Sequence, residues 1–352
     1  MLHSFFIRLK HVLKKIYENN DLDRHITNIF DYNWVIRERP DYDKKVKLSN
    51  DYYGYNYILK RYSAYKGTIN CSSEHAPGLE IVNTSDFQDK TTPFLIVNSS
   101  QRVSFLKGLC NKPIFAIGPS ICYAKNIYSD FDIKVIKKNL GKTLCVYTLH
   151  NIEDTNYLDD AEKFIEYVNC VKDKYGYKTV LVSMYFVDIE RGRHLIYERA
   201  GWIVVSAGRR RNYDFNDCMK TIISISDYAI FQSYASTVGY CIYMGVPVTI
   251  YPERKLCEYR DEGIMDDPTI SDNILAKFNA MFEGYSETIS KEQYDFCSYW
   301  YGYEDVLQPE VMKKLFEFCE KISTHTTLSE MKKIVQKNKY SICRELVLKA
   351  LE

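Results

Sequence analysis

From residue 68 onward, short apolar runs alternate with longer segments that have helical spacing. The apolar runs are short enough for buried strands and lie at 68–71, 93–99, 113–118, 142–149, 178–184, 202–208, 228–231 and 246–251. Helical spacing follows several of them, at 101–109, 159–175, 188–200 and 214–225. Strands that alternate with helices of this length form right-handed βαβ units and parallel sheets. The pattern therefore predicts an α/β protein.

The alternation is weakest over the charged stretch 126–141, and we place a domain boundary there. Residues 1–140 then predict one Rossmann-like domain with a helical N-terminus, and residues 141–285 predict a second. Beyond Tyr251 the spacing predicts helices only, at 273–282, 291–300, 309–322 and 328–351, so residues 286–352 form a C-terminal helical segment. Two parallel sheets whose carboxyl edges face each other would enclose a central cleft, which is a common place for a ligand.

The stretch 226–251 is the clearest strand–helix–strand unit, with the sequence SDYAIFQSYASTVGYCIYMGVPVTIY. Ser236 or Thr237 can cap its helix, and Gly245 ends it. Ligands of open α/β sheets bind outside the carboxyl ends of the strands, and the start of a helix suits a phosphate. This unit is therefore a candidate phosphate site. An ordinary capped corner between a strand and a helix gives the same pattern, so both interpretations stay open.

Composition narrows the class of protein. The formal net charge of +1 provides no global field that would attract nucleic acid, so no nucleic-acid partner is expected. The 11 cysteines are scattered singly without zinc-binding spacing, which predicts free thiols in a reducing cytoplasm rather than a metal site or disulfide framework. No apolar run approaches the length of a membrane span.

The first 20 residues, MLHSFFIRLKHVLKKIYENN, lack the apolar core and cleavage site of a signal peptide. They form an amphipathic pattern with a basic face. Such a helix can lie on the inner face of an anionic membrane, or it can pack on its own domain. Both alternatives stay open, so the expected location is the cytoplasm, with or without peripheral contact with the plasma membrane.

Polar residues and one glycine follow the ends of the predicted strands, on the side where a parallel sheet builds its site. In the first domain these are Glu74, His75, Gly118 and Ser120. In the second domain they are His150, Asn151, Ser183, Tyr185, Arg209, Ser233, Ser236 and Thr237.

Glu74 and His75 are the best acid/base candidates, because a histidine beside a carboxylate can titrate near neutral pH. A loop histidine that only bonds a neighbour is the alternative. His150 and Asn151 can contact a phosphate or a base edge, or they can be ordinary turn residues. Arg209 begins a run of three arginines; it can neutralise a diphosphate, or the run can be a solvated charged surface.

The nucleotide-binding motifs GxGxxG and GxxxxGK[ST] are absent, and so is the GxSxG elbow. Three Asp-x-Asp pairs have the spacing of metal-dependent sugar transferases, but none follows a clear apolar strand, so we expect them at the surface. The chemistry then depends on positioning, a base and electrostatic stabilisation, with neither metal nor cofactor.

Two sheets, a cleft and trailing helices resemble the GT-B class of glycosyltransferases. Several stretches are also similar to bacterial transferases of surface polysaccharide (capsule and lipopolysaccharide): SSEHAPGLE, FAIGPSICYAKN, LHNIEDTNY, VSMYFVDIERGRHLIYERAGWIVVSAG and SDYAIFQSYASTVGYCIYMGVPV. The resemblance implies that the C-terminal helices pack back on the first domain. It makes Glu74 and His75 acceptor-side bases, and it makes Ser233, Ser236, Thr237 and Gly239 a donor-phosphate loop. The other donor-binding candidates are the strand-end residues Gly118, Ser120, His150, Asn151, Ser183, Tyr185 and Arg209. This chain has Ala76 where such proteins often have glycine.

The reaction implied is attack by a hydroxyl of a glycan or lipid-linked acceptor on a nucleotide-sugar donor. The donor would bind the second domain and the acceptor the first. A single displacement would invert the anomeric centre. Two alternatives remain: a nucleotide-sugar epimerase of similar architecture, and a catalytically inactive GT-B-like binding subunit.

Overall fold

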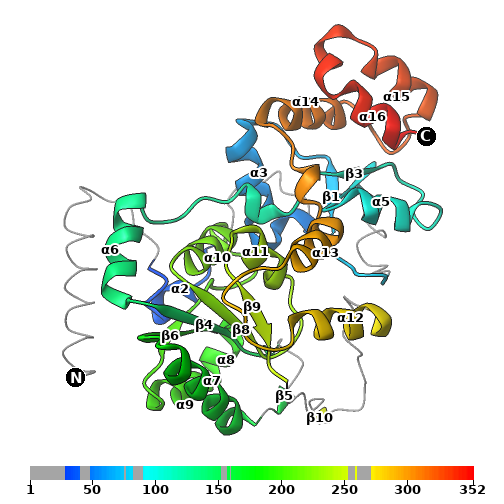
Figure 1. Cartoon of the computed structure of the whole chain (residues 1–352). Helices are drawn as coiled ribbons and strands as arrows, with labels where there is room; N and C mark the ends of the chain where they lie inside the picture. Colours follow the sequence, from blue (N-terminus) through cyan, green and yellow to red (C-terminus); the bar gives the residue numbers. More distant parts are fainter. Residues whose placement is uncertain are drawn as a thin grey trace, which may run out of the picture.

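The computed structural model of the chain is shown in Figure 1. The structure describes residues 28–39, 48–74, 77–81, 90–151, 157–158, 160–252, 258–259 and 271–352. His75, the first 27 residues and the pairs Asp21/Asp23 and Asp41/Asp43 lie outside this range.

The larger sheet has five parallel strands in the order β7-β6-β4-β8-β9. They are β4 (Thr143–Tyr147), β6 (Thr179–Ser183), β7 (Ile203–Val205), β8 (Tyr228–Phe231) and β9 (Val248–Ile250). Every residue in these strands is buried, as expected for the near-continuous apolar runs of a parallel sheet covered on both faces.

Helices cover both faces of this sheet (Figure 1). One face packs on α7 (Ala161–Tyr175) and α9 (His194–Arg199). The other packs on α6 (Asp130–Leu140), α10 (Phe215–Ser224), α11 (Thr237–Tyr243) and α12 (Asp272–Phe282). A small antiparallel pair, β5 (Tyr157–Leu158) and β10 (Glu258–Tyr259), stands apart. The predicted helix at 188–200 is instead two short ones, α8 (Phe186–Glu190) and α9, because Gly192 between them has φ +75°.

The smaller sheet has three parallel strands, β1 (Cys71–Ser73), β2 (Phe94–Val97) and β3 (Ile114–Ala116), in that order. The short helices η1 (Leu48–Gly54), α3 (Tyr55–Ser63), α5 (Ser100–Leu106) and η2 (Ser120–Cys122) adjoin or follow its strands. Helix α2 (Tyr32–Val35) instead buries Val35 in a cluster of the larger sheet. The side chain of Ser99 caps α5 by accepting a hydrogen bond from the amide of Arg102, which turns the chain directly from strand into helix.

The C-terminal segment is helical, with α13 (Lys291–Tyr301), η3 (Tyr303–Asp305), α14 (Pro309–Glu320), α15 (Leu328–Val335), η4 (Asn338–Cys343) and α16 (Arg344–Ala350). Leu315 and Phe318 of α14 share one buried cluster with Phe94 and Phe115 of the smaller sheet. Figure 1 shows α14, α15 and α16 beside that sheet. The predicted fold class, α/β with two parallel sheets and C-terminal helices that pack back, is confirmed.

The charged stretch 126–141, where the predicted alternation of strands and helices is weakest, contains a helix that the sequence pattern did not predict, α6. Ile133, Ile136 and Leu140 bury one side of α6 against the larger sheet, while lysines and the exposed Phe131 obscure that spacing in the sequence. Ser129 caps the helix, and Asp130 and Asp132 sit in its first turn, where acidic side chains are favourable. The domain boundaries themselves stay a prediction. Among the described residues, no helix is long and apolar enough to cross a membrane.

Candidate active site

The strand order of the larger sheet reverses between β4 and β8, and ligands of open α/β sheets bind at such a switch point. The loop after β4 carries His150 and Asn151, and the loop after β8 carries Ser233. A hydrogen bond joins the two loops: the amide of Leu149 donates to the side-chain oxygen of Gln232 at 2.9 Å. The structure therefore brings these donor-side candidates to the two loops at the switch point.

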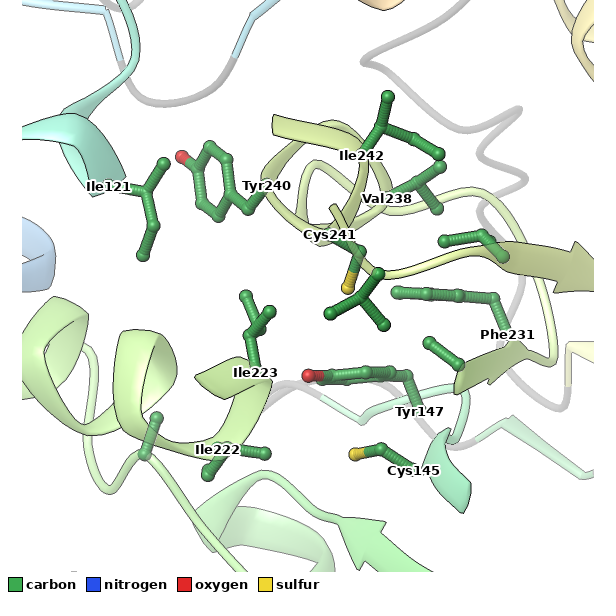
Figure 2. Packing of buried hydrophobic residues seen from close by; sticks show 14 of the residues in the cluster. Ile121, Cys145, Tyr147, Ile222, Ile223, Phe231, Val238, Tyr240, Cys241 and Ile242 are labelled. Atoms are coloured by element: carbon green, nitrogen blue, oxygen red, sulfur yellow. The ribbon is translucent and has the colours of Figure 1, made fainter. Parts of the chain in front are cut away.

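An aromatic pair forms the base of the switch point. Tyr147 ends β4, Phe231 ends β8, and their rings stack at 4.4 Å with an interplanar angle of 9°. Figure 2 shows the thiols of Cys145 and Cys241 on either side of the tyrosine ring. Burial raises the pKa of Tyr147 well above its ordinary value, with smaller contributions from the two thiols. This pair is therefore a rigid, neutral support for the loops above it.

Asp188 fixes the loop after β4. Its carboxylate is fully buried and accepts two hydrogen bonds from Asn151, one from the backbone amide at 3.1 Å and one from the side-chain amide at 2.5 Å. Burial raises the pKa of Asp188, while the bonds from Asn151 and the charge of Arg193 oppose that rise. Asn151 thus orients the loop, while the neighbouring His150 is exposed.

His150 lies beside Tyr185, with 5.4 Å between the ring centroids in an edge-on arrangement. Tyr185 directly precedes α8, and Ser183 ends β6 opposite Tyr147 of β4. Four predicted donor-side residues, His150, Asn151, Ser183 and Tyr185, therefore come from neighbouring strands of one sheet edge.

Arg209 is engaged in structural contacts. Its Nε donates to the carbonyl of Ile36 at 2.7 Å, its Nη2 pairs with Glu190, and its guanidinium lies 4.1 Å from the ring of Phe186. These contacts fasten the loop after β7 to α2 and α8. These contacts explain why an arginine stands at this position, and the explanation does not require a bound ligand.

The start of α11 departs from the expected cap. Ser236 occupies the N-cap position but its side chain makes no capping hydrogen bond, and Thr237 is already the first helical residue. Gly239 lies against α13, since a Cβ there would come within 2.4 Å of the ring of Tyr301. Close packing of two helices therefore explains this glycine.

In the smaller sheet, Glu74 is buried at the end of β1 and forms an ion pair with the equally buried Arg102 of α5. Nε of Arg102 donates to the carboxylate at 2.6 Å. The sequence predicted a catalytic acid or base here but did not predict this partner. The roles of Glu74 and His75 stay predictions, and His75 lies outside the described residues.

Gly118 and Ser120 follow β3 of the smaller sheet and contact residues that are far away in the sequence. Gly118 has φ +79°, and a Cβ there would lie 2.7 Å from a methyl group of Val306, so the position requires glycine. The hydroxyl of Ser120 lies 3.5 Å from that of Tyr240 in α11 and accepts a hydrogen bond from Asn216 in α10 at 3.3 Å. Ser120 thus contacts two of the helices that pack on the larger sheet.

Sequence reasoning missed the residues that hold the site together. Gln232 directly follows β8 and Asp188 lies in α8 beyond the end of β6, and their partners lie 83 and 37 positions away in the sequence. The one available signal was the polar residue type itself beside a buried strand. Among the described residues, no group of three or more His, Cys, Asp or Glu side chains is arranged to hold a metal ion.

Comparisons with known proteins give two solved structures of low similarity. One is the wall teichoic acid polymerase TagF, at 13% identity and a TM-score of 0.40, covering 76% of this chain and 69% of that chain. The other is Arabidopsis thaliana UGT89C1, at 12% identity and a TM-score of 0.36, covering 91% and 76%. No family model and no curated protein matches the chain. Likenesses of this degree carry no argument about activity, so the fold class rests on the two sheets themselves.

Proposed function

We propose that this chain is a glycosyltransferase that moves a sugar from a nucleotide-sugar donor to a hydroxyl of a glycan or lipid-linked acceptor, in bacterial surface polysaccharide synthesis. The observation that carries the proposal is the polar edge at the β4/β8 switch point, where a hydrogen bond from Leu149 to Gln232 joins the two loops that carry His150, Asn151 and Ser233. The smaller sheet is the acceptor side in this proposal, and the donor-binding candidate Ser120 follows its last strand and contacts Tyr240 of α11.

Each side of the site has a distinct task. The loops after β4, β6 and β8 bind the donor, and Asp188 holds Asn151 in place through two hydrogen bonds. His75 removes the proton from the acceptor hydroxyl, and the charge of the departing nucleotide is stabilised by fixed donors rather than by a metal. A single displacement inverts the anomeric centre. A lipid-linked acceptor places the reaction at the inner face of the plasma membrane.

The first experiment is a thermal-shift screen against UDP, GDP, dTDP, CMP and ADP, with and without Mg²⁺. A ligand that binds only the folded protein stabilises it, by about 2.7 kcal/mol at roughly a hundredfold excess over its Kd. This stabilisation raises the midpoint temperature of thermal unfolding. We expect one nucleotide to raise the midpoint without metal. No shift with any nucleotide would overturn the nucleotide-sugar donor.

A matched pair of variants then tests the donor side. His150→Ala should weaken binding of that nucleotide about tenfold, the value of one charge-assisted hydrogen bond. His194→Ala is the control. His194 begins α9, away from the switch point, and its ring lies 4.9 Å from that of Tyr32 in α2. Equal affinities in the two variants would remove His150 from the donor site.

A further inference from the structure

Two neighbouring hollows lie on the surface of α15, among the C-terminal helices. The first has a volume of about 450 Å³, and it is lined by Leu328, Ser329, Lys332, Lys333 and Gln336. The second has a volume of about 500 Å³; it shares Lys333 with the first, and Lys337 also lines it. We call the surface formed by these two hollows the α15 face.

Helical spacing turns the side chains of the α15 face outward. Met331 and Val335, four positions apart, are buried in the cluster that α15 shares with the smaller sheet. Lys332 and Lys333 follow Met331 directly, so they lie on the other side of the helix, where both are exposed. Thr327 caps the helix in a capping box. Helix α15 is thus held firmly from within, and its outer side is open to a partner.

The lysines of the α15 face are not neutralised by the protein. Within the described part of the chain, no carboxylate forms a salt bridge with Lys332, Lys333 or Lys337, whereas Lys314 of α14 pairs with Glu317 at 2.8 Å. The second hollow also contains Glu330, but its carboxylate accepts hydrogen bonds from the amide and the hydroxyl of Thr327, both at 2.8 Å. The α15 face therefore carries a net positive charge that complements an anionic surface.

An exposed leucine stands beside these lysines. Leu328 is 52% exposed and lines the first hollow together with Lys332 and Lys333. Lysines in the last turn of a helix are favourable for the helix itself, but an exposed leucine in its first turn is not explained in this way. At the surface of an anionic bilayer, lysines contact the phosphate headgroups and an apolar side chain enters the boundary of the acyl chains. A soluble polyanion would bind the lysines and leave the leucine in water.

The α15 face belongs to the end of the molecule that carries the smaller sheet. Figure 1 shows α14, α15 and α16 beside that sheet and away from the larger one. The smaller sheet is the acceptor side in the proposed function. A bilayer on the α15 face would therefore hold the acceptor side near a lipid-linked acceptor.

We propose that the α15 face docks on an anionic phospholipid bilayer. Lys332, Lys333 and Lys337 contact the phosphate headgroups, and Leu328 enters the boundary between headgroups and acyl chains. This interaction goes beyond the proposed function. Because it needs neither nucleotide nor sugar, it is measured independently of any transferase activity.

The test is sedimentation of the full chain with vesicles of phosphatidylcholine, alone or mixed with phosphatidylglycerol. The wild type should bind the mixed vesicles more tightly. Lys332→Gln/Lys333→Gln/Lys337→Gln should weaken that binding about a hundredfold, since each basic residue near an anionic surface contributes roughly a factor of five. Leu328→Ser should weaken it about tenfold, because the exposed half of the leucine side chain no longer leaves water. All these positions are exposed, so we expect the variants to fold as the wild type does.

The matched control removes the same charge from the larger sheet's side of the molecule. Lys163→Gln/Lys172→Gln/Lys174→Gln lies on α7 and should bind the mixed vesicles as the wild type does. Equal losses in the two triple variants would show that only net charge matters, and this would overturn the α15 face as a docking surface.

Other outcomes also decide the proposal. It would be overturned if the wild type bound neither kind of vesicle, or if the α15 triple variant bound mixed vesicles as tightly as the wild type. Inorganic polyphosphate tests a soluble polyanion: binding that the α15 triple variant loses, together with unchanged vesicle binding by Leu328→Ser, would overturn the bilayer as the partner. Vesicle binding through the α15 face by a protein that binds no nucleotide would support this proposal and overturn the glycosyltransferase.

Discussion

Two buried carboxylates stand beyond strand ends in the two sheets, and they differ in the groups that hold them. Glu74 follows β1 and is paired with the guanidinium of Arg102. Asp188 follows β6 and is held by the amides of Asn151, with Arg193 at 3.6 Å. Glu74 depends on one buried cation, whereas Asp188 depends mainly on amide hydrogen bonds, and its burial raises its pKa although those bonds and Arg193 oppose the rise. The first arrangement is built for stability, and the second keeps a group that can respond to pH beside a candidate active site.

Breaking the ion pair should have the largest effect. Arg102→Met removes the cation and leaves Glu74 buried without its charged partner, which should lower the free energy of unfolding by about 3–5 kcal/mol. Urea denaturation followed by circular dichroism measures this. The double variant Glu74→Gln/Arg102→Met should recover part of the loss. If Arg102→Met were as stable as the wild type, Arg102 would not be needed to compensate the buried charge of Glu74.

Weakening the amide clamp, the two hydrogen bonds from Asn151 to Asp188, should lower the free energy of unfolding by less than breaking the ion pair. Asp188→Asn keeps the size of the side chain but turns one acceptor into a donor that faces the side-chain amide of Asn151. We expect a loss of about 1–3 kcal/mol, the range for a buried polar group left unsatisfied. Asn151→Ala removes the side-chain bond and keeps the backbone bond, so it should cost less than Asp188→Asn. The reverse order, measured in the same urea titrations, would contradict the clamp.

The smallest expected effect is a pH dependence of stability that comes from Asp188. The pKa of Asp188 is raised in the folded protein, so between about pH 4, where an ordinary aspartate titrates, and its raised value, the folded state binds more protons than the unfolded one. Stability from this group is therefore present at low pH and is lost as pH rises through that window. The advantage of wild type over Asp188→Asn should shrink over the same window. Parallel pH curves for the two proteins would count against a titrating Asp188.

Much of the fold follows from local patterns, because a buried strand needs only a short apolar run. The run at 93–99 contains β2, and the run at 178–184 contains β6. Helix α6 was missed because exposed Phe131 and several lysines hide its buried spacing. The pairing of side chains was not predictable, since Glu74 and Arg102 are 28 positions apart and nothing local links them. The residue types at strand ends indicated where a site lies, but not which of them support the loops rather than a ligand.

Helix α10 has a consequence for how substrates enter and leave. Its Asp217 binds Arg61 and the amide of Lys125, its Thr221 accepts from the amide of Ile127, and its Asn216 bonds Tyr53 and Ser120. A hinge that swung the two sheets apart would have to break these bonds together. We therefore expect the sheets to move as one rigid body, with ligand exchange governed by loop rearrangement rather than by interdomain opening.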